Sequence, residues 1–195
     1  MELWIYGENQ YKIYALSECE NKRQKIVLNK EGYLTIEYKN GKYYFAKEQD
    51  GALRRINRKV LDVSEMELED VWEYEVKENR KFALLVLEKK KQLQSYEYYL
   101  LKEKTEWKIG SDLQNDIRYD VSGMVSGMHG KIKRDKNGWC IEDYSRNGIY
   151  KNGKRIKKRE RLKIGDSFSI FGLHFVFLGE MVAIGCRNRE RLAVG

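Results

Sequence analysis

The feature that most constrains this chain is a series of short alternating apolar runs separated by Asn-Gly turns. The runs Tyr33–Tyr38 and Tyr43–Ala46 lie on either side of Asn40-Gly41, and Asn152-Gly153 separates two further runs. An Asn-Gly pair suits the tight turn of a β-hairpin, because both residues tolerate positive φ. Many short strands at this spacing predict an all-β chain built as β-sandwiches.

A charged segment at residues 88–94 interrupts this strand pattern, which restarts at Tyr96. The chain of 195 residues is long enough for two small domains, and we expect them at residues 1–90 and 95–180. Residues 181–195 show weak periodicity and end in the basic run Arg187–Arg191. We therefore expect residues 181–195 to be a tail or linker.

The two halves of the chain repeat each other in part. Two turns recur at an offset of 97 residues: Lys39–Gly41 as Lys136–Gly138, and Asp50-Gly51 as Asn147-Gly148. The run Phe82–Leu87 corresponds loosely to His174–Leu178. Matching turns in matching strand contexts favour a tandem duplication. The alternative is one large sandwich that contains two similar hairpins.

Positive charge is concentrated in the second half of the chain. Residues 1–93 carry 18 Lys and Arg against 17 Asp and Glu, whereas residues 94–195 carry 20 against 13. Eight basic residues and the single acid Glu160 lie between Lys151 and Lys163. The simplest interpretation of that run is a solvated hairpin. The alternatives are an acidic protein partner, lipid headgroups or nucleic acid. Nucleic acid is the least favoured, because nearby aromatic residues alternate as strand core residues do.

The sequence argues against an enzyme and against a metal or cofactor. It contains no glycine-rich phosphate loop leading into a helix and no paired histidines at ligand spacing. Cys19, Cys140 and Cys186 are odd in number and widely spaced, as expected for reduced thiols in the cytosol. No apolar run approaches the ~18–20 residues that span a bilayer, and the N-terminus lacks a signal peptide. We expect a cytoplasmic location with no membrane insertion.

Two short loops, Ser126–Ile132 and Ser145–Tyr150, carry the best candidate for a binding site. Both are rich in Ser, Gly and Asn and lie between predicted strands. Gly and Asn permit positive φ, so a partner's backbone can approach closely. Exposed N–H groups, hydroxyls and an amide are suited to an anion or a peptide backbone. The exposed aromatic candidates Tyr144 and Tyr150 flank the second loop and are equally explained as core residues at strand ends.

Several spaced motifs identify the second half as similar to a forkhead-associated (FHA) domain. In order along roughly residues 96–178, they are Ile109-Gly110, Asn115–Ile117, Ser126-x-x-His129-x-x-Ile132, Gly138–Asp143, Ser145-x-Asn147-Gly148, Asn152-Gly153 and Leu162-x-x-Gly165-Asp166. The resemblance implies an eleven-stranded β-sandwich with binding loops at one end. Residues 1–90 resemble a degenerate copy, which lacks Ser-x-x-His and has Asp50 where Asn is expected.

FHA domains usually bind phosphothreonine peptides, and the resemblance assigns roles to individual positions. It implies a phosphate-binding Arg directly after Gly110, where this chain has Ser111. Ser126 and Asn147 keep their positions and would contact phosphate and peptide backbone. Arg146 or Lys131 would supply charge from a new direction. The candidate ligand-binding residues are Ser111, Ser126, Gly127, Lys131, Arg146 and Asn147, and the candidate structural residues are Gly110, His129 and Gly148.

Each assignment has a structural alternative. His129 has no Cys or carboxylate partner at nucleophile spacing, so bracing of the loop is expected rather than catalysis. Ser126 would serve equally well as a local cap of its own loop. Asn147-Gly148 would be kept for turn geometry alone.

The tandem arrangement resembles the cytosolic head of the membrane-bound FtsK/SpoIIIE-type ATPases of Gram-positive type VII secretion. That resemblance implies transmembrane helices and ATP-binding domains after residue 195. We predict a protein-interaction module that acts in assembly or recruitment without standard phosphothreonine binding. Its partners would be other secretion components or its own subunits. The alternative is a phosphothreonine reader with a rebuilt pocket, and nucleic-acid binding is third.

Overall fold

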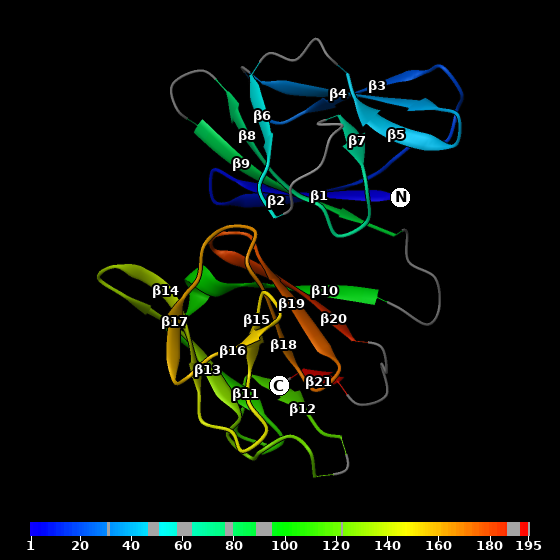
Figure 1. Cartoon of the computed structure of the whole chain (residues 1–195). Coiled ribbons are helices and arrows are strands. Elements are labelled where there is room, and N and C mark those ends of the chain that lie inside the picture. The colour runs from blue at the N-terminus through cyan, green and yellow to red at the C-terminus, as the bar shows by residue number, and fades with distance from the viewer. Residues whose placement is uncertain are drawn as a thin grey trace. The chain divides into compact units, whose positions relative to one another are not determined.

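The computed structural model is almost entirely β-strand, which confirms the predicted fold class (Figure 1). It describes residues 1–30, 32–46, 51–57, 64–76, 80–88, 95–121, 123–186 and 192–194. The chain divides into two compact units, Met1–Lys89 and Lys90–Gly195. Within the described ranges, no helix has the length and apolar character needed to cross a bilayer.

Two sheets face each other in the first unit. The five-stranded sheet has the order β2 (Gln10–Ala15), β1 (Glu2–Gly7), β9 (Arg80–Leu87), β8 (Val71–Val76) and β6 (Ala52–Arg55). The four-stranded sheet has the order β3 (Arg23–Val27), β4 (Tyr33–Lys39), β5 (Lys42–Phe45) and β7 (Glu65–Met66). Alternate residues of both sheets, among them Leu34, Phe45, Trp72 and Leu84, form one core.

The second unit also has two sheets, with six strands each. The first has the order β10 (Ser95–Leu100), β20 (Met181–Cys186), β19 (Leu173–Phe177), β18 (Ser167–Ile170), β15 (Tyr150–Lys151) and β16 (Lys154–Arg155). The second has the order β17 (Arg159–Arg161), β14 (Gly138–Asp143), β13 (Gly130–Asp135), β11 (Glu106–Gly110), β12 (Ile117–Tyr119) and β21 (Leu192–Val194). A 3₁₀ turn, η2 (Leu101–Glu103), follows β10. The core between the sheets includes Trp107, Ile132, Phe168 and Phe175.

The predicted Asn-Gly hairpins have the expected backbone. Between β4 and β5, Asn40 and Gly41 have φ values of 51° and 74°. Between β15 and β16, Asn152 and Gly153 have φ values of 47° and 78°. Two consecutive positive φ values define the turn that joins twisted strands with least distortion, which explains the choice of residues.

Both units pair their ends in the same way. In the first unit β1 pairs antiparallel with β9, and β9 with β8. In the second, β10 pairs antiparallel with β20, and β20 with β19. The expected match of Phe82–Leu87 with His174–Leu178 is therefore wrong by one strand, because β9 occupies the place of β20 rather than that of β19. That the first unit is a degenerate FHA sandwich stays a prediction.

The segment expected to be a tail or linker is in part a central strand. Residues 181–186 form β20, which lies between β10 and β19, and Val182 and Ile184 point into the core. The sequence signal was weak because Ala183 and Gly185, which alternate with Val182 and Ile184, are small rather than polar. Residues 192–194 form β21 on β12. The basic run Arg187–Arg191 lies outside the described residues.

A buried ion pair lies inside the first unit. The side chains of Arg55 and Asp70 are 2% and 0% exposed, and their Nη2 and Oδ2 atoms are 3.2 Å apart. Arg55 also donates to the carbonyl of Glu65, and its guanidinium lies 4.4 Å from the ring centre of Trp72. Asp70 in turn accepts the backbone N–H of Glu67. The pair therefore fixes the segment that joins β7 to β8.

We predict that Arg55→Met destabilises the chain by about 3–5 kcal/mol, because it leaves the buried carboxylate of Asp70 without its cation. Denaturant unfolding followed by tryptophan fluorescence measures the change. Arg54→Met is the matched control. Arg54 is the neighbour of Arg55 in β6, and its bond to Glu73 is at the surface, so its loss should cost at most about 1 kcal/mol. Equal costs for the two variants would contradict the prediction.

Candidate functional site

The two predicted loops meet at one end of the second unit. β11 ends at Gly110 and β13 begins at Gly130, while β14 ends at Asp143 and β15 begins at Tyr150. Since β13 lies between β11 and β14, the ends of these three strands are neighbours in one sheet, and the second loop crosses from β14 to β15 in the other sheet. The loops that leave them lie beyond β11 and β12 at the lower end of the second unit in Figure 1. We call residues 111–121, 123–129 and 143–150 the loop edge.

His129 ties the two loops together. It is fully buried, and its Nδ1 accepts the backbone N–H of Ser126 at 3.1 Å. Because Nδ1 is the acceptor, the imidazole proton belongs on Nε2, which lies 3.4 Å from the carbonyl oxygen of Gly148. Burial lowers the pKa of His129, and the Gly148 carbonyl and Asp143 oppose that shift only in part. A neutral imidazole therefore bridges the loops, in the bracing role expected for it.

Asn115 also holds two of the loops together, a role that the sequence did not predict. Its buried Nδ2 donates to the carbonyls of Asp112 at 3.0 Å and Gly127 at 2.6 Å. These bonds hold the turn after β11 against the Ser126 loop. The signal was present in the Asn115–Ile117 motif, but nothing in the sequence said which carbonyls the amide would reach.

The close approach of the loops requires glycine at Gly110, one of the predicted structural positions. A Cβ at Gly110 would lie 2.1 Å from the carbonyl oxygen of Gly127. A Cβ at Gly127 would lie 2.5 Å from Oδ2 of Asp112. Gly127 is therefore covered by the carboxylate of Asp112, which brings a negative charge next to Ser126.

Most polar groups of the loop edge are used within it. The hydroxyl of Ser111 donates to the carbonyl of Val125 at 3.2 Å, and Nδ2 of Asn147 donates to that of Met124 at 2.7 Å. The hydroxyl oxygen of Ser126 accepts the N–H of Arg146 at 3.4 Å. The proton on the Ser126 hydroxyl is not used in any of these bonds, so Ser126 can still donate to a partner.

A further carboxylate shapes the second loop. Asp143 accepts the N–H of Ser145 at 2.8 Å, its hydroxyl at 2.6 Å, and the N–H of Ile149 at 3.1 Å. The hydroxyl oxygen of Ser145 then accepts the N–H of Gly148 at 2.7 Å. Gly148 has a φ of 91°, so the turn favours glycine there, as predicted. Sequence reasoning missed the role of Asp143, although Asp two residues before Ser is a common turn signal.

The charges of the loop edge differ from those expected. Lys131 forms an ion pair with Glu106 at 3.0 Å and lies 5.5 Å from the ring centre of Tyr144, so the structure does not bring it to Ser126. Arg155, which sequence reasoning missed, packs against Gly148, and its Nη2 donates to the carbonyl of Arg146 at 3.2 Å. The loop edge is therefore bipolar, with Arg146 and Arg155 on the Asn147 side and Asp112 on the Gly127 side.

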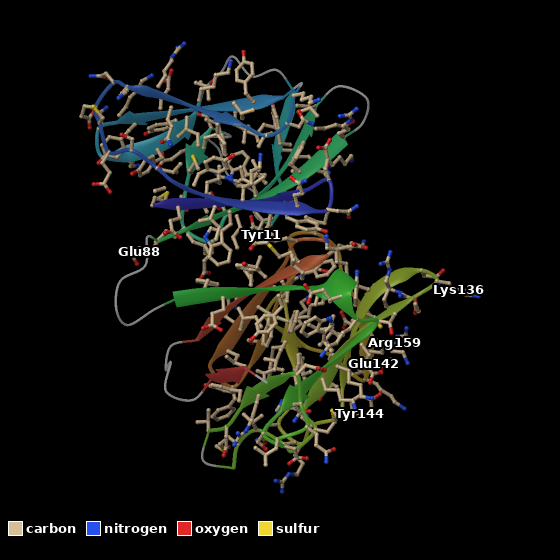
Figure 2. All side chains as sticks on the ribbon, turned by 180° about the vertical axis from the view of Figure 1, so that it is seen from behind. Tyr11, Glu88, Lys136, Glu142, Tyr144 and Arg159 are labelled. Atoms are coloured by element: carbon tan, nitrogen blue, oxygen red, sulfur yellow. The ribbon has the colours of Figure 1, made fainter. Side chains whose placement is uncertain are left out.

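Part of the basic run is paired within the unit. Arg161 and Arg159 both bind the carboxylate of Asp135. These contacts, with the hydrogen bonds from Arg161 as the largest cause, lower the pKa of Asp135 to about 2. Nε of Arg159 also donates to the sulfur of Cys140 at 3.2 Å. Arg159 lies on the same side of the unit as Tyr144 (Figure 2). The exposed lysines of the run are Lys154, Lys157, Lys158 and Lys163.

No metal centre is formed in the described parts of the chain. Their His, Cys, Asp and Glu side chains do not come together in any group of three or more that could hold a metal ion. The buried histidine uses both ring nitrogens in contacts to the backbone.

Comparison with known protein families finds one match in this region. The family model of the FHA domain matches residues 107–171, which carry the loop edge. The second unit contains an FHA domain. An FHA domain is a protein-interaction module without enzymatic activity. The sequence matches none of the curated proteins with which it was compared.

Three solved structures are similar to parts or all of this chain. The N-terminal FHA domain of EssC, a component of the bacterial type VII secretion apparatus, covers 100% of this chain and 95% of its own, with 17% identity and a TM-score of 0.44. EmbR of Mycobacterium tuberculosis in complex with a low-affinity phosphopeptide matches 39% of this chain and 20% of its own chain, with 30% identity and a TM-score of 0.37. The FHA-2 domain of the ABC transporter Rv1747 of the same organism matches 41% of this chain and 73% of its own chain, with 28% identity and a TM-score of 0.37.

The buried imidazole predicts an acid-sensitive loop edge. Because the folded chain lowers the pKa of His129 below its ordinary 6.5, the stability that depends on neutral His129 is complete above pH 6.5. It is lost as the pH falls from 6.5 towards the folded pKa, since the unfolded chain binds the proton more readily.

Titration of the imidazole C–H signals by NMR measures this pKa, and substitution of His174, the other histidine, assigns the signals. We expect a midpoint below 6.5 for His129. A midpoint at or above 6.5 would show that the imidazolium is tolerated between the loops.

Proposed function

We propose that this chain is a protein-interaction module that binds an unphosphorylated segment of a partner protein at the loop edge. The bipolar charge of that edge is the observation that carries the proposal. The carboxylate of Asp112 lies over Gly127, and Nη2 of Arg155 reaches the carbonyl of Arg146, so the loops that carry Ser126 hold both signs of charge. Such an arrangement suits a peptide that carries both signs of charge better than it suits a dianion.

Two features argue against phosphothreonine as the ligand. Ser111 stands where the resemblance implies a phosphate-binding Arg, and its hydroxyl is bonded to the carbonyl of Val125. A charge-assisted guanidinium bond is roughly twice as strong as a neutral one, so its loss removes the main attraction for phosphate. The carboxylate of Asp112 at Gly127 adds repulsion in the loop that carries the Ser126 donor.

A rebuilt phosphothreonine pocket is the second candidate. It would use Ser126, Arg146 and Asn147, and the observation that favours it is Arg155, which brings a second guanidinium to the same loop. Calorimetric titration with a phosphothreonine peptide library separates the two functions. We expect no binding tighter than ~1 mM, or about −4 kcal/mol. Tighter binding that Ser126→Ala or Asn147→Ala removes would establish the phosphothreonine reader.

We further propose that the module belongs to the cytosolic head of a type VII secretion ATPase, where it recruits secretion components or packs against its own subunits. The support is the tandem arrangement read from the sequence, together with the shared pairing of first and last strands in both units. On this proposal, membrane-spanning and ATP-binding parts of the same protein follow the chain.

Crosslinking in cells, with secretion measured in parallel, tests the assignment. We expect Arg146→Glu and Asp112→Lys each to reduce crosslinks to the partner, because both reverse a charge of the loop edge. Lys136→Glu is the matched control, since Lys136 is exposed in the hairpin turn at the far end of β13 and β14. Normal secretion after deletion of residues 1–195, with no crosslink to any secretion component, would refute the secretion role. A gel shift at low salt would instead indicate nucleic-acid binding.

A further inference from the structure

Large apolar side chains are exposed around the loop edge. Five of them lie at this end of the second unit: Leu113 at 78%, Met124 at 44%, Tyr144 at 52%, Tyr150 at 43% and Phe171 at 45% exposure. Isolated exposed apolar residues are ordinary, but a cluster at one end of a domain marks an interaction surface. We call these five residues the apolar tip.

Strand pairing and loop contacts bring the residues of the apolar tip close to one another. Met124 is bonded through its carbonyl to Asn147, and Leu113 follows Asp112, whose carboxylate covers Gly127. Tyr150 opposes Ser169 in β18. Phe171 turns the chain from β18 into β19, and its carbonyl accepts the hydroxyl of Tyr119, which lies at the end of β12. All five residues therefore surround the same group of loops.

Cations lie beside this tip. The N–H of Asp143 donates to the carbonyl of Lys158, and that of Ile156 donates to the carbonyl of Ile149, so residues 155–158 run alongside the second loop. Arg146, Arg155, Lys157 and Lys158 are all exposed there. Arg159 and Arg161 differ from them, because both are engaged by Asp135.

We propose that the apolar tip and its flanking cations form a peripheral docking surface for an anionic lipid bilayer. Protruding Leu and Met side chains can enter the acyl boundary, and tyrosines suit the headgroup level. Lys and Arg beside them are attracted to anionic headgroups. Lys157 and Lys158, which the proposed peptide site does not use, favour a bilayer over a protein partner at this flank, because interfaces between proteins are depleted of lysine.

This inference goes beyond the proposed peptide function and tests different residues. The side chains of Leu113, Lys157 and Lys158 take no part in the hydrogen bonds that hold Ser126, Arg146 and Asn147, so their substitution leaves those bonds in place. Failure of the lipid experiment therefore leaves the crosslinking experiment unaffected, and the reverse is also true.

Co-sedimentation of the full chain with phosphatidylcholine vesicles, with and without phosphatidylglycerol, tests the proposal. We expect binding to the anionic vesicles only, weakening as salt rises from ~0.05 M to ~0.5 M. Lys157→Gln with Lys158→Gln should lower the partition coefficient about 30-fold, since each cation near the surface contributes about one factor of five. Leu113→Ser should lower it about tenfold through lost apolar burial.

Matched controls carry the same changes at the opposite end of the unit. Lys136→Gln with Lys163→Gln removes the same charge, and Ile164→Ser, like Leu113→Ser, removes an exposed apolar side chain. Both controls should keep the partition coefficient within about twofold, because they lie beyond the reach of screened surface charge.

Several results would overturn the proposal. One is the absence of sedimentation with anionic vesicles at low salt. Another is an equal loss in the test and control variants, which would show attraction by net charge alone. A third is unchanged vesicle binding in the tip variants together with loss of their crosslinks to a partner protein, which would assign the apolar tip to that protein.

Discussion

The loop edge depends on one contact, the close approach of the backbone after β11 to the backbone before β13. Gly110 allows it, since a Cβ at that position would collide with the backbone carbonyl of Gly127. Asn115 and the neutral imidazole of His129 then hold the three loop segments in place. These bonds hold the backbone at Ser126, Gly127 and Gly148, so loss of either side chain would release the loops there.

The side chains of the loop edge carry both signs of charge, unlike those of a simple anion-binding site. The carboxylate of Asp112 lies over Gly127, while Arg155 reaches the second loop from the following hairpin. The scaffold of the FHA domain is thus combined with a mixed charge pattern. Fold and function separate here, because the sheets set where the loops lie and only the loop side chains set what they bind.

Charge in the second unit is divided between structure and surface. Arg159 and Arg161 neutralise Asp135 and join β13, β14 and β17, so they contribute to the sheet. Lys157 and Lys158, adjacent in sequence, remain at the surface beside the apolar tip. A count of basic residues between Lys151 and Lys163 therefore overstates the charge that a partner meets.

The sequence by itself determined the all-β class, the Asn-Gly hairpins and the two loops, because turn chemistry and strand alternation are local properties. It also identified Ser126, His129 and Asn147 as residues of one edge, through the spacing of the FHA motifs. Tertiary structure alone decided that residues 181–186 form a central strand, because small residues there hide the alternation. Only the tertiary structure showed that Asp112 and Arg155 lie at the loop edge and that Lys131 pairs with Glu106 instead. These contacts join residues distant in sequence, so no local pattern predicts them.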